Sequence, residues 1–117
     1  MICHITLRTS KLNETVKFYN WLLGLAVSRT LNTQDGLIVF LGENETKFEL
    51  IEDTKAGSIN IKELTIGFSV DNLDEKLAML DSRQITHSQV ISPSPNTRFA
   101  FLTDLNGCGI QLLERKE

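Results

Sequence analysis

Two stretches of the chain share one pattern of apolar residues at a constant spacing. Residues 2–19 and 64–80 each begin with alternating apolar and polar residues, which is typical of a strand, and continue with helical spacing. The matched positions, each pair 61 residues apart, are Ile5 and Ile66, Leu12 and Leu73, Val16 and Leu77, and Tyr19 and Leu80. A constant offset across both segments predicts one structural unit that is built twice.

Each predicted strand has an apolar face that should pack against the helix following it. Cys3 shares the apolar face of the first strand with Ile5, so we expect its thiol to be buried and inert. Gly24 is a natural end for the first helix. Either Asp71 or Asn72 could cap the start of the second helix.

The remaining segments predict three more strands in each unit. In the first unit these are residues 25–31, 37–41 and 46–52, with Asp35 and Gly36 as a hairpin turn. In the second unit they are residues 85–91, 98–102 and 108–113, with residues 92–96, which contain two prolines, as a loop. His87 is therefore expected to be an exposed strand residue with no role.

These elements predict an α+β protein of one domain, in which two βαβββ modules form a curved, incomplete eight-stranded barrel around a cleft. One helix is expected to pack outside each module. We place module one at residues 1–53, a linker at 54–60 and module two at 61–117. At 117 residues the chain suits one domain, whereas half of it would make a marginal core.

The charge and composition exclude several classes of partner. The net charge is −3 and no basic block is present, which argues against nucleic acid as a partner. No apolar run approaches the length of a membrane span, so we expect a cytoplasmic protein that does not enter a membrane. Two cysteines are too few for a disulfide framework.

The polar faces of the sheets should line the predicted cleft. The residues expected there are His4, Thr6, Arg8, Lys47, Glu49, Ile51, Glu63, Thr65, Ser69, Gly109, Gln111 and Leu113. Because the two units repeat, His4 and Glu49 in the first hold the places of Thr65 and Gln111 in the second.

Several short segments distributed over nearly the whole chain resemble one known family. They are His4–Arg8 with Leu12, Phe18–Tyr19, Leu23–Gly24, Phe48–Leu50, Ser69–Asn72, Thr103–Asp104, Asn106–Gly107 and Ile110–Leu112. In these segments the chain resembles the vicinal oxygen chelate superfamily, which includes glyoxalase I, bleomycin-resistance proteins, extradiol dioxygenases and fosfomycin-resistance enzymes. The resemblance is specific for the fold but weak for the reaction, because this fold carries many chemistries.

The resemblance implies one divalent metal, such as Ni, Zn, Mn or Fe, held by one residue from each of four strands. Carried over by position, these residues are His4, Glu49, Thr65 and Gln111. Histidine nitrogen and carboxylate oxygen are good ligands, whereas Gln111 offers a neutral carbonyl and Thr65 a hydroxyl. We therefore expect either a metal held by His4, Glu49 and Gln111, with water or Glu63, or no cofactor at all.

The same residues have alternative interpretations. His4 is either a metal ligand or a hydrogen-bonded histidine of the binding site. Glu49 is the first candidate for a catalytic base, with Glu63 as the other, and is otherwise an ion-pair partner of Lys47, Arg8 or Arg98. In glyoxalase-like proteins an arginine at the place of Arg8 holds an anionic substrate group; otherwise Arg8 pairs with Glu63 or Glu49.

Three functions follow. The first is a protein that binds a small molecule, such as an anionic one, without a metal, as bleomycin-resistance proteins do. The residues expected to contact this ligand are Thr6, Arg8, Lys47, Glu63 and Thr65. The second is a metal-dependent lyase or isomerase with an unusual ligand set. The third is a structural or regulatory dimer without a ligand. The resemblance implies a homodimer in each case.

Overall fold

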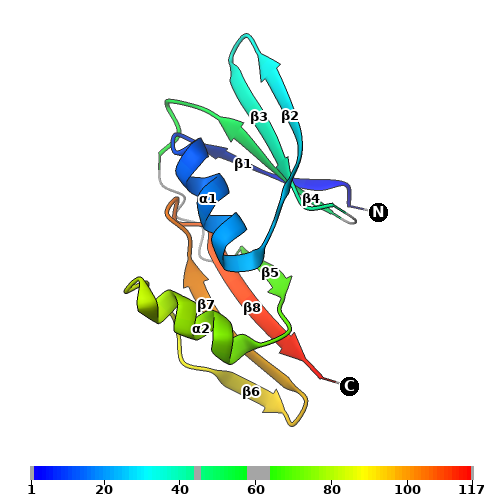
Figure 1. The fold of residues 1–117 in the computed structure, drawn as a ribbon, viewed down its shortest axis with the longest axis vertical. Helices are drawn as coiled ribbons and strands as arrows, with labels where there is room; N and C mark the ends of the chain where they lie inside the picture. The colour runs from blue at the N-terminus through cyan, green and yellow to red at the C-terminus, as the bar shows by residue number, and fades with distance from the viewer. Residues whose placement is uncertain (1, 44–45, 58–63, 117) are drawn as a thin grey trace. The chain divides into compact units, whose positions relative to one another are not determined.

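The chain divides into two compact units, Met1–Ser58 and Ile59–Glu117. The computed structural model describes residues 2–43, 46–57 and 64–116. Unit 1 holds β1 (His4–Thr9), α1 (Leu12–Leu23), β2 (Val27–Thr33), β3 (Gly36–Leu41) and β4 (Lys47–Glu52). Unit 2 holds β5 (Thr65–Ser69), α2 (Leu73–Ser82), β6 (Ile91–Ser94), β7 (Thr97–Thr103) and β8 (Gly109–Arg115) (Figure 1). The predicted pair of βαβββ modules is confirmed.

Strand pairing follows the same plan in both units. Each unit has an open four-stranded sheet, ordered β1-β4-β3-β2 in unit 1 and β5-β8-β7-β6 in unit 2. The leading strand runs parallel to the closing strand, and Ile5 pairs with Phe48 as Ile66 pairs with Ile110. The duplication seen in the sequence therefore extends to the register of the strands.

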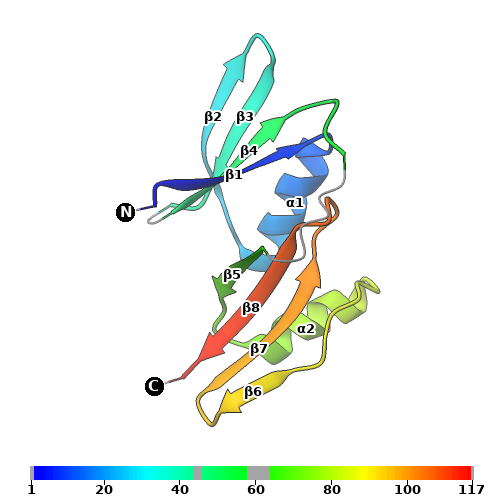
Figure 2. The ribbon, with the colours of Figure 1, turned by 180° about the vertical axis from the view of Figure 1, so that it is seen from behind.

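Helix α1 covers one face of the sheet of unit 1, and Figure 2 shows the opposite face. Its residues Leu12, Tyr19 and Leu22 are buried, and the ring of Tyr19 meets that of Phe48 edge-on at 4.9 Å between centroids. Each large apolar side chain buried in this way contributes roughly 1.5–3 kcal/mol. Gly24 ends the helix with φ 65°, as predicted, and its amide donates to the carbonyl of Asn20.

Helix α2 is fixed to its own sheet by an apolar face and by its first turn. Leu73, Leu77 and Leu80 are buried. Of the two predicted caps the structure has Asn72, whose Oδ1 accepts a 3.0 Å hydrogen bond from the amide of Glu75. The side-chain oxygen thus satisfies one of the free amides at the start of the helix.

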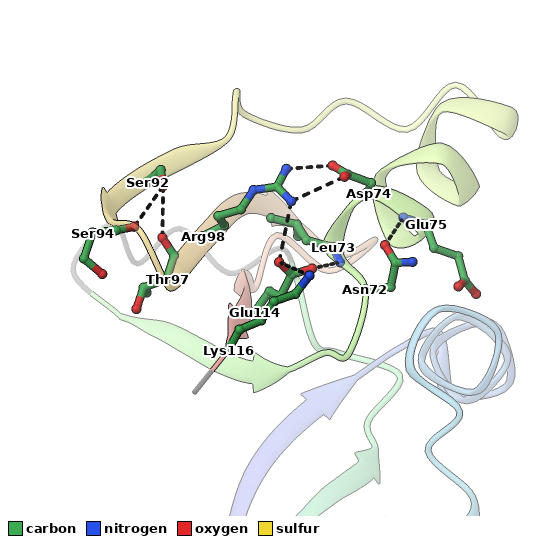
Figure 3. Close-up of polar contacts among 10 residues, drawn as sticks. All are labelled: Asn72, Leu73, Asp74, Glu75, Ser92, Ser94, Thr97, Arg98, Glu114 and Lys116. Atoms are coloured by element: carbon green, nitrogen blue, oxygen red, sulfur yellow. Dashed lines mark hydrogen bonds and ion pairs between the residues drawn. The ribbon is translucent and has the colours of Figure 1, made fainter.

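Charged side chains also hold the start of α2 (Figure 3). Glu114 of β8 is only 4% exposed, and its Oε2 accepts a hydrogen bond from the amide of Leu73 at 2.8 Å. Arg98 of β7 lies between two carboxylates, 2.7 Å from Asp74 Oδ1 and 3.5 Å from Glu114 Oε1. Arg98 therefore has its partners on the helix-facing side of its own sheet, which corrects the expectation that it pairs with Glu49.

The predictions of a strand at residues 85–91 and of a loop at residues 92–96 are wrong. Residues 85–90 contain no regular strand, and β6 begins at Ile91 and ends at Ser94, inside the predicted loop. Single hydrogen bonds hold this segment: the amide of Ser88 donates to the Phe101 carbonyl, and the amide of Phe101 donates to Ser88 Oγ. An edge strand tolerates the proline at position 93, because its outer amide needs no partner.

Cys3 is exposed rather than buried. It precedes β1, whose first fully buried residue is Leu7 at 5% exposure, while Ile5 is still 37% exposed. The alternating apolar residues of the sequence therefore begin at side chains that are still exposed, before the first buried residue of β1. Neither helix of the described part of the chain is long and apolar enough to cross a membrane.

Candidate functional site

The sheet face of unit 1 that lies opposite α1 carries most of the residues singled out in the sequence. On β1 and β4, Thr6 pairs with Glu49 and His4 with Lys47, and Phe40 of β3 pairs with Glu49 from the other side. We call this surface the polar face of unit 1. Its members include His4, Thr6, Arg8, Arg29, Leu31, Ile38, Phe40, Lys47, Glu49 and Ile51.

A hydrogen-bonded cluster lies in the middle of this face. Thr6 Oγ1 donates to Glu49 Oε1 at 2.5 Å, and His4 Nε2 lies 3.5 Å from the same oxygen. The His4 ring also meets Phe40 edge-on, with centroids 6.0 Å apart. Glu49 is mostly covered, with 14% of its side chain exposed, whereas that of His4 is 46% exposed. Glu49 is thus oriented by its neighbours, and His4 remains open to a ligand.

The pair His4 and Glu49 has the spacing of two ligands on one metal. Two bonds of about 2.1 Å at a tetrahedral angle place the donor atoms about 3.4 Å apart. However, within residues 2–43, 46–57 and 64–116 no group of three or more His, Cys, Asp or Glu side chains could hold a metal ion. Since protein metal sites commonly use at least three protein ligands, the residues described do not fit a complete site.

The equivalent face of unit 2 has uncharged side chains at its centre, and the one charged side chain that the described residues place on it is Arg115, at the end of β8 beside Thr97. We call this central part the neutral face of unit 2, and it includes Thr65, Gly67, Ser69, Phe99, Phe101, Gly109, Gln111 and Leu113. The registers place Thr65 where unit 1 has His4, and Gln111 where it has Glu49. The exchange replaces an imidazole and a carboxylate by a hydroxyl and an amide.

Gly67 and Gly109 leave space for the side chains of Gln111 and Thr65. A Cβ added at Gly67 would lie 3.3 Å from Gln111 Oε1, so the amide rests directly over Gly67. A Cβ at Gly109 would lie 3.0 Å from the carbonyl of Leu64 and 3.3 Å from Thr65 Oγ1. In unit 1 the place of Gly67 is taken by Thr6. The Thr6–Glu49 hydrogen bond therefore has no equivalent in unit 2, where an amide supplies both a donor and an acceptor.

Aromatic residues on both faces were missed by the sequence analysis. Phe99 and Phe101 pair with Leu113 and Gln111, and their rings meet edge-on at 5.5 Å. Phe40 holds the corresponding place beside Glu49. The signal was present, because strict alternation along residues 98–102 places Phe99 and Phe101 on the face opposite the buried Ala100.

The other predicted site residues have the following positions. Arg8 is exposed and Lys47 partly buried, both on the polar face of unit 1, and Thr65 is exposed on the neutral face of unit 2. Glu63 lies outside the described residues. A metal held by His4, Glu49 and Gln111, and a ligand contacted by Thr6, Arg8, Lys47, Glu63 and Thr65, stay predictions.

Comparisons with known proteins agree with this architecture. The model of the Glyoxalase/Bleomycin resistance protein/Dioxygenase superfamily matches residues 1–112. The trypanothione-dependent glyoxalase I of Leishmania major is similar in structure, with 26% identity, a TM-score of 0.81, and 97% of this chain and 86% of that chain covered. No curated protein matches the sequence.

Two further solved structures share the fold. One is a glyoxalase family protein from Enterococcus faecalis, with 19% identity, a TM-score of 0.77 and 97% of each chain covered. The other is an antibiotic-binding protein from Streptomyces sp. CB03234, with 16% identity, a TM-score of 0.74, and 99% of this chain and 96% of that chain covered.

Proposed function

The chain belongs to the glyoxalase/bleomycin resistance protein/dioxygenase superfamily, and from this membership and its sheet faces we propose that it binds a small organic molecule without a metal. One observation carries the proposal: Gln111 and Thr65 take the places that Glu49 and His4 hold in the other unit. Of these four positions, only two provide strong metal donors. An amide also cannot accept a proton from carbon, as a glyoxalase-type base must.

The polar face of unit 1 suits a ligand with an anionic group. Its charged members are three cations, Arg8, Arg29 and Lys47, and one carboxylate, Glu49. Glu49 already accepts a hydrogen bond from Thr6, and His4 lies beside it. Charge-assisted hydrogen bonds from arginine to a carboxylate or phosphate are among the strongest polar contacts in proteins.

The neutral face of unit 2 suits an uncharged, ring-bearing group. Gln111 can donate to a carbonyl or accept from an N–H, and Phe99 and Phe101 offer aromatic edges beside it. The similar Streptomyces structure is an antibiotic-binding protein, which supports a binding role for a chain of this fold. The predicted cleft between the modules and the predicted homodimer stay part of the proposal, and light scattering on the purified protein tests the dimer.

The proposal is tested by metal analysis together with a ligand screen. Protein purified without chelator is assayed for Ni, Zn, Mn and Fe, and small anionic aromatic compounds are screened by thermal shift with and without EDTA. We expect less than about 0.1 metal ion per chain, since two donors bind weakly, and stabilising compounds whose effect survives EDTA. Arg8→Gln should weaken the binding of anionic compounds. Lys17→Gln, on the exposed side of α1, should leave that binding unchanged.

One observation favours a second function. The 3.5 Å separation of His4 Nε2 and Glu49 Oε1 suits two ligands of one metal, so a metal-dependent lyase or isomerase with Glu49 as its base is the alternative. If the purified protein holds stoichiometric metal, and His4→Ala loses both this metal and the turnover, the alternative is established and the proposal above is overturned.

A further inference from the structure

His87 lies outside the candidate site, in the segment between α2 and β6, and makes two short polar contacts. Its Nε2 lies 2.8 Å from Asp81 Oδ1, at the end of α2, and its Nδ1 lies 2.7 Å from the carbonyl oxygen of Ser88. Only 18% of the side chain is exposed. His87 is therefore neither exposed nor part of a strand, which corrects the expectation from the sequence.

The chemistry of the two partners determines the state of the ring. A carboxylate and a backbone carbonyl are both acceptors, and a neutral imidazole carries a single N–H. Both contacts are hydrogen bonds only when the imidazole holds two protons. We propose that protonated His87 is a latch, which fastens residues 85–90 to the end of α2 and releases them when the ring loses a proton.

The surroundings of the ring agree with this assignment. The hydrogen bond to the Ser88 carbonyl raises the pKa of His87 above 6.5, burial opposes the shift, and Asp81 adds to it. Asp81 is the charged group in contact with the ring, and Arg83, in the turn after α2, is the nearest cation along the chain. The next residue on the segment is the neutral Ser88, whose amide is hydrogen-bonded to Phe101 of β7.

The latch is connected to the neutral face of unit 2 through Ser88. The Ser88 amide donates to the Phe101 carbonyl at 2.8 Å, and the Phe101 amide donates to Ser88 Oγ at 2.8 Å. Phe101 in turn pairs with Gln111. When the latch opens, these two amides lose the support that keeps residues 85–90 against β7, so the position of Phe101 becomes sensitive to pH in the neutral range.

Nuclear magnetic resonance on the full chain tests this proposal. The protein has two histidines, and the spectrum of His87→Gln identifies which ring signals belong to His87. We expect the midpoint of His87 to lie above that of a free imidazole. The hydrogen-exchange protection factors of the Ser88 and Phe101 amides should fall roughly threefold to tenfold as pH rises through that midpoint.

Two variants separate the latch from a general effect of pH. Asp81→Asn keeps the size of the partner but removes its charge, so it should lower the His87 midpoint. His87→Gln should leave both amides weakly protected at every pH, while the amides of β3 and β4 stay as in the wild type. Protection of Ser88 and Phe101 that is independent of pH, or unchanged in His87→Gln, would overturn the proposal.

Discussion

The backbone amide of Leu73 donates a 2.8 Å hydrogen bond to the carboxylate of Glu114, which lies 41 residues later in the chain. The contact joins the first turn of α2 to the strand that closes its sheet. A carboxylate near the start of a helix also interacts favourably with the helix dipole. This one side chain therefore helps to fix where α2 begins.

We expect Glu114→Ala to lower the free energy of unfolding by about 1–3 kcal/mol, because it leaves a buried amide without its acceptor. Urea denaturation measures the change. Glu43→Ala, at an exposed acidic position, is the matched control and should change stability by less than about 0.5 kcal/mol. Equal losses in the two variants would show that the hydrogen bond contributes nothing specific.

Gly24→Ala should destabilise the protein by about 1 kcal/mol through its backbone alone. Gly24 has φ 65°, which side chains disfavour, and a Cβ there would meet no atom within 4 Å. Gly57 is equally unobstructed and has no such φ, so Gly57→Ala is the control. A stability of Gly24→Ala equal to that of Gly57→Ala would contradict a conformational role for Gly24.

The fold was largely predictable because its signals are local and repeated. Alternation identified β1 and β5, helical spacing identified α1 and α2, and the constant offset predicted equal registers. The strand predicted at residues 85–91 is wrong because two hydrogen bonds between Ser88 and Phe101, rather than a strand ladder, hold residues 85–90. No sequence pattern reports a contact such as that between Ser88 and Phe101.

The candidate site was predictable only in part. Alternation alone places Thr6 and Glu49 on the polar face of unit 1. The hydrogen bond between them depends on which residues of two strands stand opposite each other, and the sequence does not state this register. Phe101 was missed for another reason, since alternation alone places it on the face opposite the buried Ala100.

The two cysteines should differ sharply in reactivity. Cys3 is exposed, whereas Cys108 is 7% exposed, and burial, with a smaller contribution from Asp104, raises the pKa of its thiol to about 11. At pH 8 only about one in 1,000 Cys108 side chains is then a thiolate, the reactive form. A disulfide reagent should label one thiol per chain quickly and the second only in denaturant. Cys3→Ser should leave no fast thiol, and fast labelling of that variant would contradict the prediction.

His87 should make folding stability depend on pH in a defined direction. Because the pKa of His87 is raised above 6.5 in the folded chain, the folded state binds this proton more tightly than the unfolded state does. Its contribution is complete below about pH 6.5 and is lost as pH rises through the raised pKa. Between pH 5.5 and 8.5 we expect the Tm of the wild type to fall by about 1–4 °C more than that of His87→Gln. An equal fall in Tm for the two proteins would contradict a contribution of His87 protonation to stability.

The neutral positions of unit 2 can be converted to match unit 1. Thr65→His combined with Gln111→Glu gives unit 2 the imidazole and carboxylate that unit 1 has in His4 and Glu49. If the four positions share one metal, as the family resemblance implies, the double variant should bind Ni²⁺ or Zn²⁺ at least about tenfold more tightly than the wild type, because a second carboxylate and a second imidazole join the ligand set.

Calorimetric titration of the metal-free proteins measures this affinity, and adding His4→Ala to the double variant decides which residues hold the metal. Loss of most of the gain in the triple variant would mean that His4 shares the new site with position 65. A gain that survives the loss of His4 would mean that unit 2 binds the metal alone. That outcome would contradict the predicted cleft, because its central claim is that the two sheet faces act on one bound group.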